Sequence, residues 1–200
     1  MKAERPLTLS VAIPCRADEP GLAPMLDSLL AACRSSGLPS GCVREVLICL
    51  NGVEADCPCG PLRAVRDFCM RHEIAIQEVD LSASQERAPH EQHSGREGLS
   101  CLVLLAGWRG KPKAMNTLWQ WAQGEAVLFC DADVRVDPEA VSHLYTRLQQ
   151  EQQLRLIAAR EVPTLEAGAS LWSRLGALPY RFNFGNAGGR LFLIRREALL

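Results

Sequence analysis

Residues 125–150, "EAVLFCDADVRVDPEAVSHLYTRLQQ", give the clearest indication of the fold, because a strand, an acidic turn and a helix follow one another directly. The apolar run "AVLFC" predicts a buried strand. Asp137 as the N-cap and Pro138 as the first helical residue predict that a helix begins there. Asp131 and Asp133 stand between the two elements, so two negative charges directly follow a buried strand.

The same alternation of elements continues on both sides of this stretch. Apolar runs and helical spacings predict strands at 7–14, 43–50, 74–81, 99–106 and 154–162 and helices at 20–37, 61–72 and 111–124. This order predicts an α/β fold with a mostly parallel sheet flanked by helices. The polar segment 82–98 is expected to be an exposed loop. The chain stops on "LFLIRREALL", a strand and the start of a helix, so the fold is expected to be incomplete at its C-terminus.

Composition narrows the class of protein. The 200 residues are 48% hydrophobic and carry a net charge of −1, which allows a substantial core and gives no electrostatic reason to expect nucleic acid. Nine cysteines, several within apolar runs, predict a reducing cytoplasmic location. We find no signal peptide and no apolar run long enough to span a membrane.

Two short segments resemble parts of metal sites but are not interpreted as such. "CPC" at 57–59 lacks a second pair of ligands, and "HEQH" at 90–93 lacks an apolar helix to hold it.

Polar clusters end three of the predicted strands: "PCRADE", "NGVEAD" and "DAD". Parallel strands place their carboxyl ends at one edge of a sheet, where ligands bind. In an extended segment Asp131 and Asp133 would face the same way and could share Mg²⁺ or Mn²⁺ with substrate phosphates. The alternative is a solvated turn or a helix cap, although Asp137 already fills the cap position.

A second candidate is "GKPKAMN" at 110–116. Lys111 or Lys113, at the start of a predicted helix, could bind an anionic group, and the alternative is that both are solvated. The pattern of a Walker-type phosphate loop is missing. An acidic metal site nearby favours the anion-binding role of these lysines, because binding of a nucleotide diphosphate needs both a metal ion and basic side chains.

Four segments together resemble family 2 glycosyltransferases, which have the Rossmann-like GT-A fold. They are "LSVAIPCRADEPGLAPMLDSLL", "EVLICLNGVEAD", "GKPKAMNTLWQWAQGEAVLFCDADVRVDPEAV" and "GGRLFLIRREAL". The resemblance implies nucleotide-sugar contacts at Pro14, Arg16, Glu19, Asn51, Lys111, Asn116 and Asp131, and a metal held by Asp131 and Asp133. Ala17 stands where the family usually has Asn, and Asn51 where it commonly has an Asp that contacts the base.

The implied activity is that of an inverting glycosyltransferase of the hexosyltransferase type. It would move a sugar from an Mn- or Mg-bound nucleotide-diphospho-sugar to the hydroxyl of a saccharide, lipid or other acceptor. The resemblance is also compatible with peripheral membrane association. Residues 1–162 would form the nucleotide-sugar-binding half, and 163–200 would begin the acceptor side.

The general base is not assigned. In the family it is an Asp in an "ED"-like motif after the segment that resembles "RREAL", which places it beyond Leu200. Glu161 and Glu166 lie in the matching half, but their sequence context does not support this role. Two alternatives therefore stay open: a non-catalytic nucleotide-sugar-binding remnant, and a sugar-phosphate nucleotidyltransferase. The latter is disfavoured because no Gly-rich loop follows the first strand.

Overall fold

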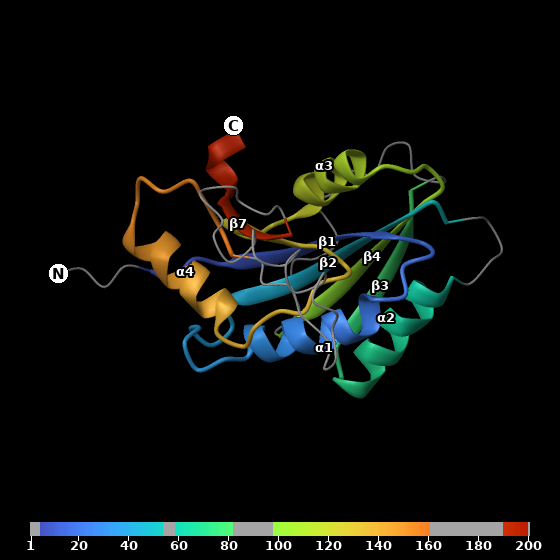
Figure 1. The fold of residues 1–200 in the computed structure, drawn as a ribbon, viewed down its shortest axis with the longest axis horizontal. Coiled ribbons are helices and arrows are strands. Elements are labelled where there is room, and N and C mark those ends of the chain that lie inside the picture. The colour runs from blue at the N-terminus through green and yellow to red at the C-terminus, as the bar shows by residue number, and fades with distance from the viewer. Residues whose placement is uncertain (1–4, 54–58, 82–97, 161–189, 200) are drawn as a thin grey trace, which may run out of the picture.

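The computed structural model describes residues 5–53, 59–81, 98–160 and 190–199. Within them one sheet lies between two layers of helices (Figure 1). The strands are β1 (Leu9–Arg16), β2 (Val43–Asn51), β3 (Ala75–Asp80), β4 (Ser100–Ala106), β5 (Ala126–Cys130), β6 (Leu156–Ala158) and β7 (Leu191–Arg195). The helices are α1 (Leu22–Cys33), α2 (Gly60–Arg71), α3 (Lys111–Trp121) and α4 (Ala140–Gln150), and a 3₁₀ turn, η1, covers Arg196–Leu199.

The sheet has the order β3-β4-β2-β1-β5-β7-β6. Strands β1 to β5 are parallel wherever they pair, whereas β7 runs antiparallel to both β5 and β6. From β1 the chain moves to β2 on one side, and it later crosses through α3 to β5 on the other. The strand order therefore reverses between β1 and β5, which is where open α/β sheets bind ligands, beyond the carboxyl ends of their strands.

Two apolar layers hold the helices to the sheet. On one face, alternate residues of β1 such as Val11 and Ile13 pack with α1, α2 and α4. On the other face Ala12 packs with Ala114 and Leu118 of α3. These side chains are fully buried, as expected for parallel strands covered on both faces. The sheet consequently fixes the positions of the loops at its carboxyl edge.

The predicted α/β class is confirmed, and several predicted boundaries are wrong. Strand β1 continues through Pro14 to Arg16, because its pairing with β5 ends at Ala12 and the missing proline N–H interrupts no bond to that strand. Helix α3 ends at Trp121, before the predicted stop at Gly124.

The predicted start of α4 is also wrong. The helix begins at Ala140 rather than at Pro138. Asp137 instead accepts a hydrogen bond from the Glu139 backbone N–H on its Oδ1 at 2.9 Å, and its carbonyl accepts the Ala140 N–H at 3.0 Å. Asp137 therefore caps a turn that precedes the helix.

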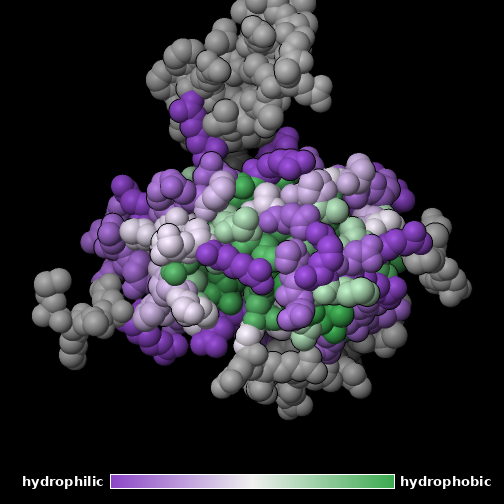
Figure 2. Space-filling model, turned by 90° about the horizontal axis from the view of Figure 1, so that it is seen from below, coloured by the Kyte–Doolittle hydropathy of each residue, from purple (hydrophilic) through white to green (hydrophobic). Residues whose placement is uncertain are grey.

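The surface on the side of α1 and α2 shows hydrophobic side chains among hydrophilic ones (Figure 2). Met70 of α2 is 77% exposed and lines a surface pocket that it shares with Ala23 of α1 and with other residues of α2. None of the helices in the described ranges combines the length and the apolar character that a membrane span requires. The predicted loop 82–98, apart from Gly98, the "HEQH" segment and residues 161–189 lie outside the described residues.

Buried thiols should make the protein less stable in alkaline solution. All cysteines in the described residues are free, and burial raises the pKa of Cys49 to about 12 and also raises the pKa values of Cys15 and Cys130. An unfolded thiol has a pKa of about 8.5, so between about pH 9 and 12 the native state binds more protons than the unfolded state. The unfolding free energy should therefore fall with rising pH, by about 1.4 kcal/mol per pH unit for each such thiol.

Urea unfolding at about pH 8 and about pH 10 measures this slope. The Cys49→Ala variant is the control, because it removes one buried thiol and should reduce the slope by that thiol's share. Equal unfolding free energies at the two pH values would contradict the prediction.

Candidate functional site

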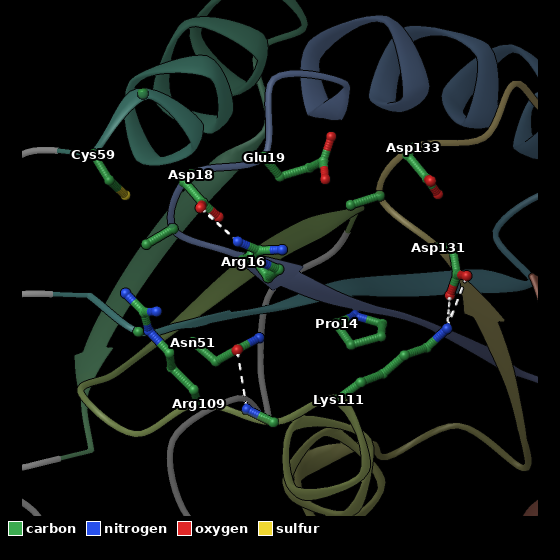
Figure 3. A pocket seen from close by; sticks show the side chains of 15 residues that line it. Pro14, Arg16, Asp18, Glu19, Asn51, Cys59, Arg109, Lys111, Asp131 and Asp133 are labelled. Atoms are coloured by element: carbon green, nitrogen blue, oxygen red, sulfur yellow. Dashed lines mark hydrogen bonds and ion pairs between the residues drawn. The ribbon is translucent and has the colours of Figure 1, made fainter.

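A cleft of about 800 Å³ opens at the carboxyl edge of the sheet, between the ends of β1 and β5 (Figure 3). Its lining comes from the ends of β1 and β2, from the segments that follow β1, β2, β4 and β5, and from the starts of α2 and α3. The lining residues are Pro14, Arg16, Ala17, Asp18, Glu19, Asn51, Gly52, Cys59, Gly60, Arg109, Gly110, Lys111, Asp131, Ala132 and Asp133. The described residues of the three polar clusters predicted to share one edge of the sheet do share it, and residues 54–56 of the second cluster lie outside the described part of the chain.

Asp131 and Asp133 both line this cleft, although not for the reason that the sequence suggested. Residues 132 and 133 form a turn rather than an extended segment. The Asp131 backbone N–H donates to the Arg190 carbonyl at 2.8 Å, which fixes the turn to the residue that precedes β7. The side chain of Asp131 is 17% exposed and that of Asp133 is 51% exposed, so Asp133 is the more accessible carboxylate.

Each carboxylate has a cationic neighbour. Lys111 Nζ lies 2.7 Å from Asp131 Oδ1 and 2.8 Å from Oδ2, and Arg190 Nη1 lies 3.4 Å from Asp133 Oδ2. Lys113 instead lies over the Trp108 ring, 4.6 Å from its centroid. Of the two candidate lysines, only Lys111 therefore faces the cleft. Each negative charge of the carboxylate pair is therefore opposed by a positive charge from a residue distant in sequence.

The loop after β1 is held by its own charged residues. Arg16 Nη2 donates to Asp18 Oδ2 at 2.6 Å, and this hydrogen bond lowers the pKa of Asp18, with a smaller contribution from Arg109. Glu19 Oε1 accepts the Gly21 backbone N–H at 2.9 Å, immediately before α1. Arg16 and Glu19 therefore shape the loop as well as lining the cleft.

The remaining predicted residues differ in their placement. Pro14 lines the cleft, and Asn51 lies at its wall, 5% exposed. Asn116 is exposed on α3 and is not among the residues that line the cleft. The described residues contain no group of three or more His, Cys, Asp or Glu side chains that could hold a metal ion.

Sequence reasoning missed Asp18, Arg109 and Cys59. Arg109 lies in the "GWRGK" segment, and its position two residues before Lys111, between a buried strand and a helix, was the available signal. Cys59 and Gly60 line the cleft because α2 begins beside the loop that follows β1, and this contact has no local signature in the sequence.

The strand order and a cleft at its switch point define an open α/β ligand-binding domain. A family model described as Glycosyl transferase family 2 matches residues 82–199, which is more than half of the chain. The chain belongs to this family, so the resemblance inferred from its motifs is confirmed. Comparison with curated proteins found no match.

Solved structures with the GT-A fold have the same architecture. The mannosyltransferase PcManGT from Pyrobaculum calidifontis, in complex with GDP-Man and Mn²⁺, is 18% identical, with a TM-score of 0.60 over 98% of this chain and 46% of that one. Glucosyl-3-phosphoglycerate synthase from Mycobacterium tuberculosis, in complex with Mn²⁺, UDP and glucosyl-3-phosphoglycerate, is 17% identical, with a TM-score of 0.52 over 96% and 57%. TarS from S. aureus is 18% identical, with a TM-score of 0.51 over 79% and 23%. The chain thus spans about half of the length of the first two proteins, and these likenesses establish the fold.

Proposed function

We propose that this chain is the nucleotide-sugar-binding part of an inverting glycosyltransferase. It would transfer a sugar from a nucleotide-diphospho-sugar to an acceptor hydroxyl. The observation that carries the proposal is the meeting of Asp131, Asp133 and Lys111 in one cleft at the switch point of the sheet. The complexes of similar folds with GDP-Man or UDP and Mn²⁺ support it.

The residues present fit a divalent cation. Two carboxylates offer hard oxygen ligands, and Mg²⁺ or Mn²⁺ commonly takes only one or two carboxylates and completes its shell with substrate phosphates and water. Asp133 would be the first ligand, because half of its side chain is exposed. Asp131 would become available once Lys111 turns away from it. When bound, such an ion neutralises the charge that develops on a departing nucleoside diphosphate.

Lys111 has a part of its own in this site. It is the first residue of α3, so its ammonium group and the positive end of the helix dipole act at the same place. In the protein without a ligand the ammonium neutralises Asp131. An anionic diphosphate in the cleft would offer it a second partner, while Asp131 would be left to bind the cation.

Removal of the proton from the acceptor hydroxyl requires a general base. We assign this role to none of the described residues. Glu161 and Glu166 lie outside them. The assignment of residues 163–200 to the acceptor side stays a prediction, as does the cytoplasmic location. Within that region, β7 belongs to the same sheet as the cleft and pairs with β5.

The test is calorimetric titration of the protein with UDP and with GDP, in Mn²⁺ and in EDTA. We expect Mn²⁺ to raise the affinity for at least one of them by about tenfold or more, because a cation held by Asp131 and Asp133 would neutralise negative charge on the diphosphate. Bovine serum albumin titrated identically controls for nonspecific binding. Affinities that are the same in Mn²⁺ and EDTA would contradict the metal assignment, and the lack of any binding would contradict the proposed function.

A further inference from the structure

The side chain of Asn51 is used within the protein. Its Nδ2 donates to the Cys15 carbonyl at 2.7 Å, and its Oδ1 accepts the Gly110 backbone N–H at 3.3 Å. The opposite orientation of the amide would place two acceptors together at Cys15 and two donors together at Gly110, so the contacts fix which atom is which. Asn51 therefore links the end of β1 to the loop that leads into α3.

The backbone around Asn51 makes the same link. The Gly52 N–H donates to the carbonyls of Ala106 and Trp108, at 2.8 Å each, and the Ala17 N–H donates to the Asn51 carbonyl at 3.0 Å. The loops after β1, β2 and β4 are thus joined at a single turn. Because all three loops line the cleft, the turn sets their relative positions.

Gly52 brings Arg109 into this arrangement. Gly52 has a φ of +78°, which favours glycine, and a Cβ at this position would lie 3.0 Å from both Cγ and Nε of Arg109. The Arg109 side chain therefore lies directly against the turn. Two residues further along the chain, Lys111 reaches Asp131.

We propose that Asn51 is a positioning residue, which holds the loop carrying Arg109 and Lys111 against the end of β1, and that it does not recognise the nucleobase. This differs from the base contact that the resemblance implied for its position. Both polar atoms of its side chain already have protein partners, and its burial leaves little of it for a ligand. Where the inference concerns ligand binding, it rests on the proposed function.

The first test requires no ligand. In the wild-type protein the Gly110 amide should be protected from hydrogen exchange, and Asn51→Ala should increase its exchange rate by about tenfold, since the accepting oxygen is lost. The control is Gln120→Ala, which removes an exposed amide side chain from α3 and should leave this rate unchanged. A Gly110 amide that exchanges equally fast in wild type and Asn51→Ala would overturn the inference.

The second test uses UDP, GDP and inorganic pyrophosphate as probes. Asn51→Ala should weaken binding of all three by a similar factor, about tenfold, because the change acts through the loop that carries Lys111. If Asn51 contacts the base, pyrophosphate binding will be unchanged and the ratio of UDP to GDP affinity will shift, which would overturn the proposal. If none of the probes binds the wild-type protein, the proposed function fails, while the exchange experiment still decides the role of Asn51.

Asn51→Asp is a second variant, in case Asn51→Ala does not fold. It keeps an acceptor for the Gly110 N–H but places a carboxylate oxygen against the Cys15 carbonyl, where a donor is needed. We expect it to weaken binding of the three probes as the alanine variant does. Full retention of wild-type binding and Gly110 protection would show that the bond to Cys15 is dispensable, contrary to the proposal.

Discussion

Asp133→Ala is expected to abolish the increase in nucleotide affinity that Mn²⁺ causes. Asp133 is the more exposed of the two cleft carboxylates, and its ion pair with Arg190, at 3.4 Å, is longer than the 2.7 Å pair between Asp131 and Lys111. It is therefore the carboxylate that a cation can reach without first displacing a close partner. In calorimetry the affinity of the variant for each nucleotide should be the same in Mn²⁺ and in EDTA, a loss of about tenfold or more relative to the wild type in Mn²⁺.

The matched control is Glu139→Ala, which makes the same change of charge outside the cleft. Glu139 is exposed and makes no side-chain hydrogen bond that caps α4. This variant should keep the full effect of Mn²⁺. If Asp133→Ala keeps it too, while its circular dichroism matches the wild type, Asp133 is not a metal ligand.

The carboxyl edge of the sheet could be predicted because its determinants are local. Each strand is an apolar run, each run ends in polar residues, and the parallel order brings these ends together. Asp131 was recognised in this way, Lys111 was recognised at the start of a predicted helix, and both line the cleft. The antiparallel direction of β7 was not predicted, because a strand's direction depends on its neighbour and leaves no pattern in its own residues.

The electrostatic arrangement of the cleft could not be predicted in the same way. The partner of Asp133 is Arg190, 57 residues away, and it arrives there only because β7 pairs with β5. The internal contacts of Asn51 likewise depend on a carbonyl of β1 and an N–H at the start of α3. A sequence motif can identify a polar residue of this kind, but it does not show which atoms of the protein form hydrogen bonds or ion pairs with that residue. Asn116 illustrates the opposite case, since its motif matched and its side chain lies outside the cleft lining.

A buried polar cluster near the amino ends of the central strands β1 and β2 lies at the site of the largest expected loss of stability. Glu45 Oε1 accepts hydrogen bonds from Ser10 Oγ at 2.5 Å and from the Gln123 N–H at 2.7 Å, and Ser10 Oγ also accepts the Gly124 N–H at 2.7 Å. Ser10 and Glu45 are almost completely buried. The cluster thus joins β1, β2 and the segment between α3 and β5 at the centre of the sheet, where polar groups must be paired.

Gly124→Ala should destabilise the protein by about 3 kcal/mol and lower its Tm by about 6–12 °C. A Cβ at Gly124 would lie 2.5 Å from the Ser10 backbone N and 2.8 Å from the Leu9 carbonyl carbon. These are backbone atoms of a strand paired on both sides, so they cannot move aside without disturbing the pairing with β2 and β5. If the segment between α3 and β5 moves instead, the N–H of residue 124 loses its hydrogen bond to Ser10 Oγ. Thermal and urea unfolding followed by circular dichroism measure the change.

Gly60→Ala separates this steric effect from the general effect of replacing glycine. Gly60 is the first residue of α2, and a Cβ there would meet nothing within 4 Å. The Tm of the Gly60→Ala protein should be unchanged or slightly raised, because alanine has a higher helix propensity than glycine. A Gly124→Ala protein as stable as Gly60→Ala would mean that the central strand yields to the extra methyl group. The tight packing of the segment before β5 against β1 would then not be needed for stability.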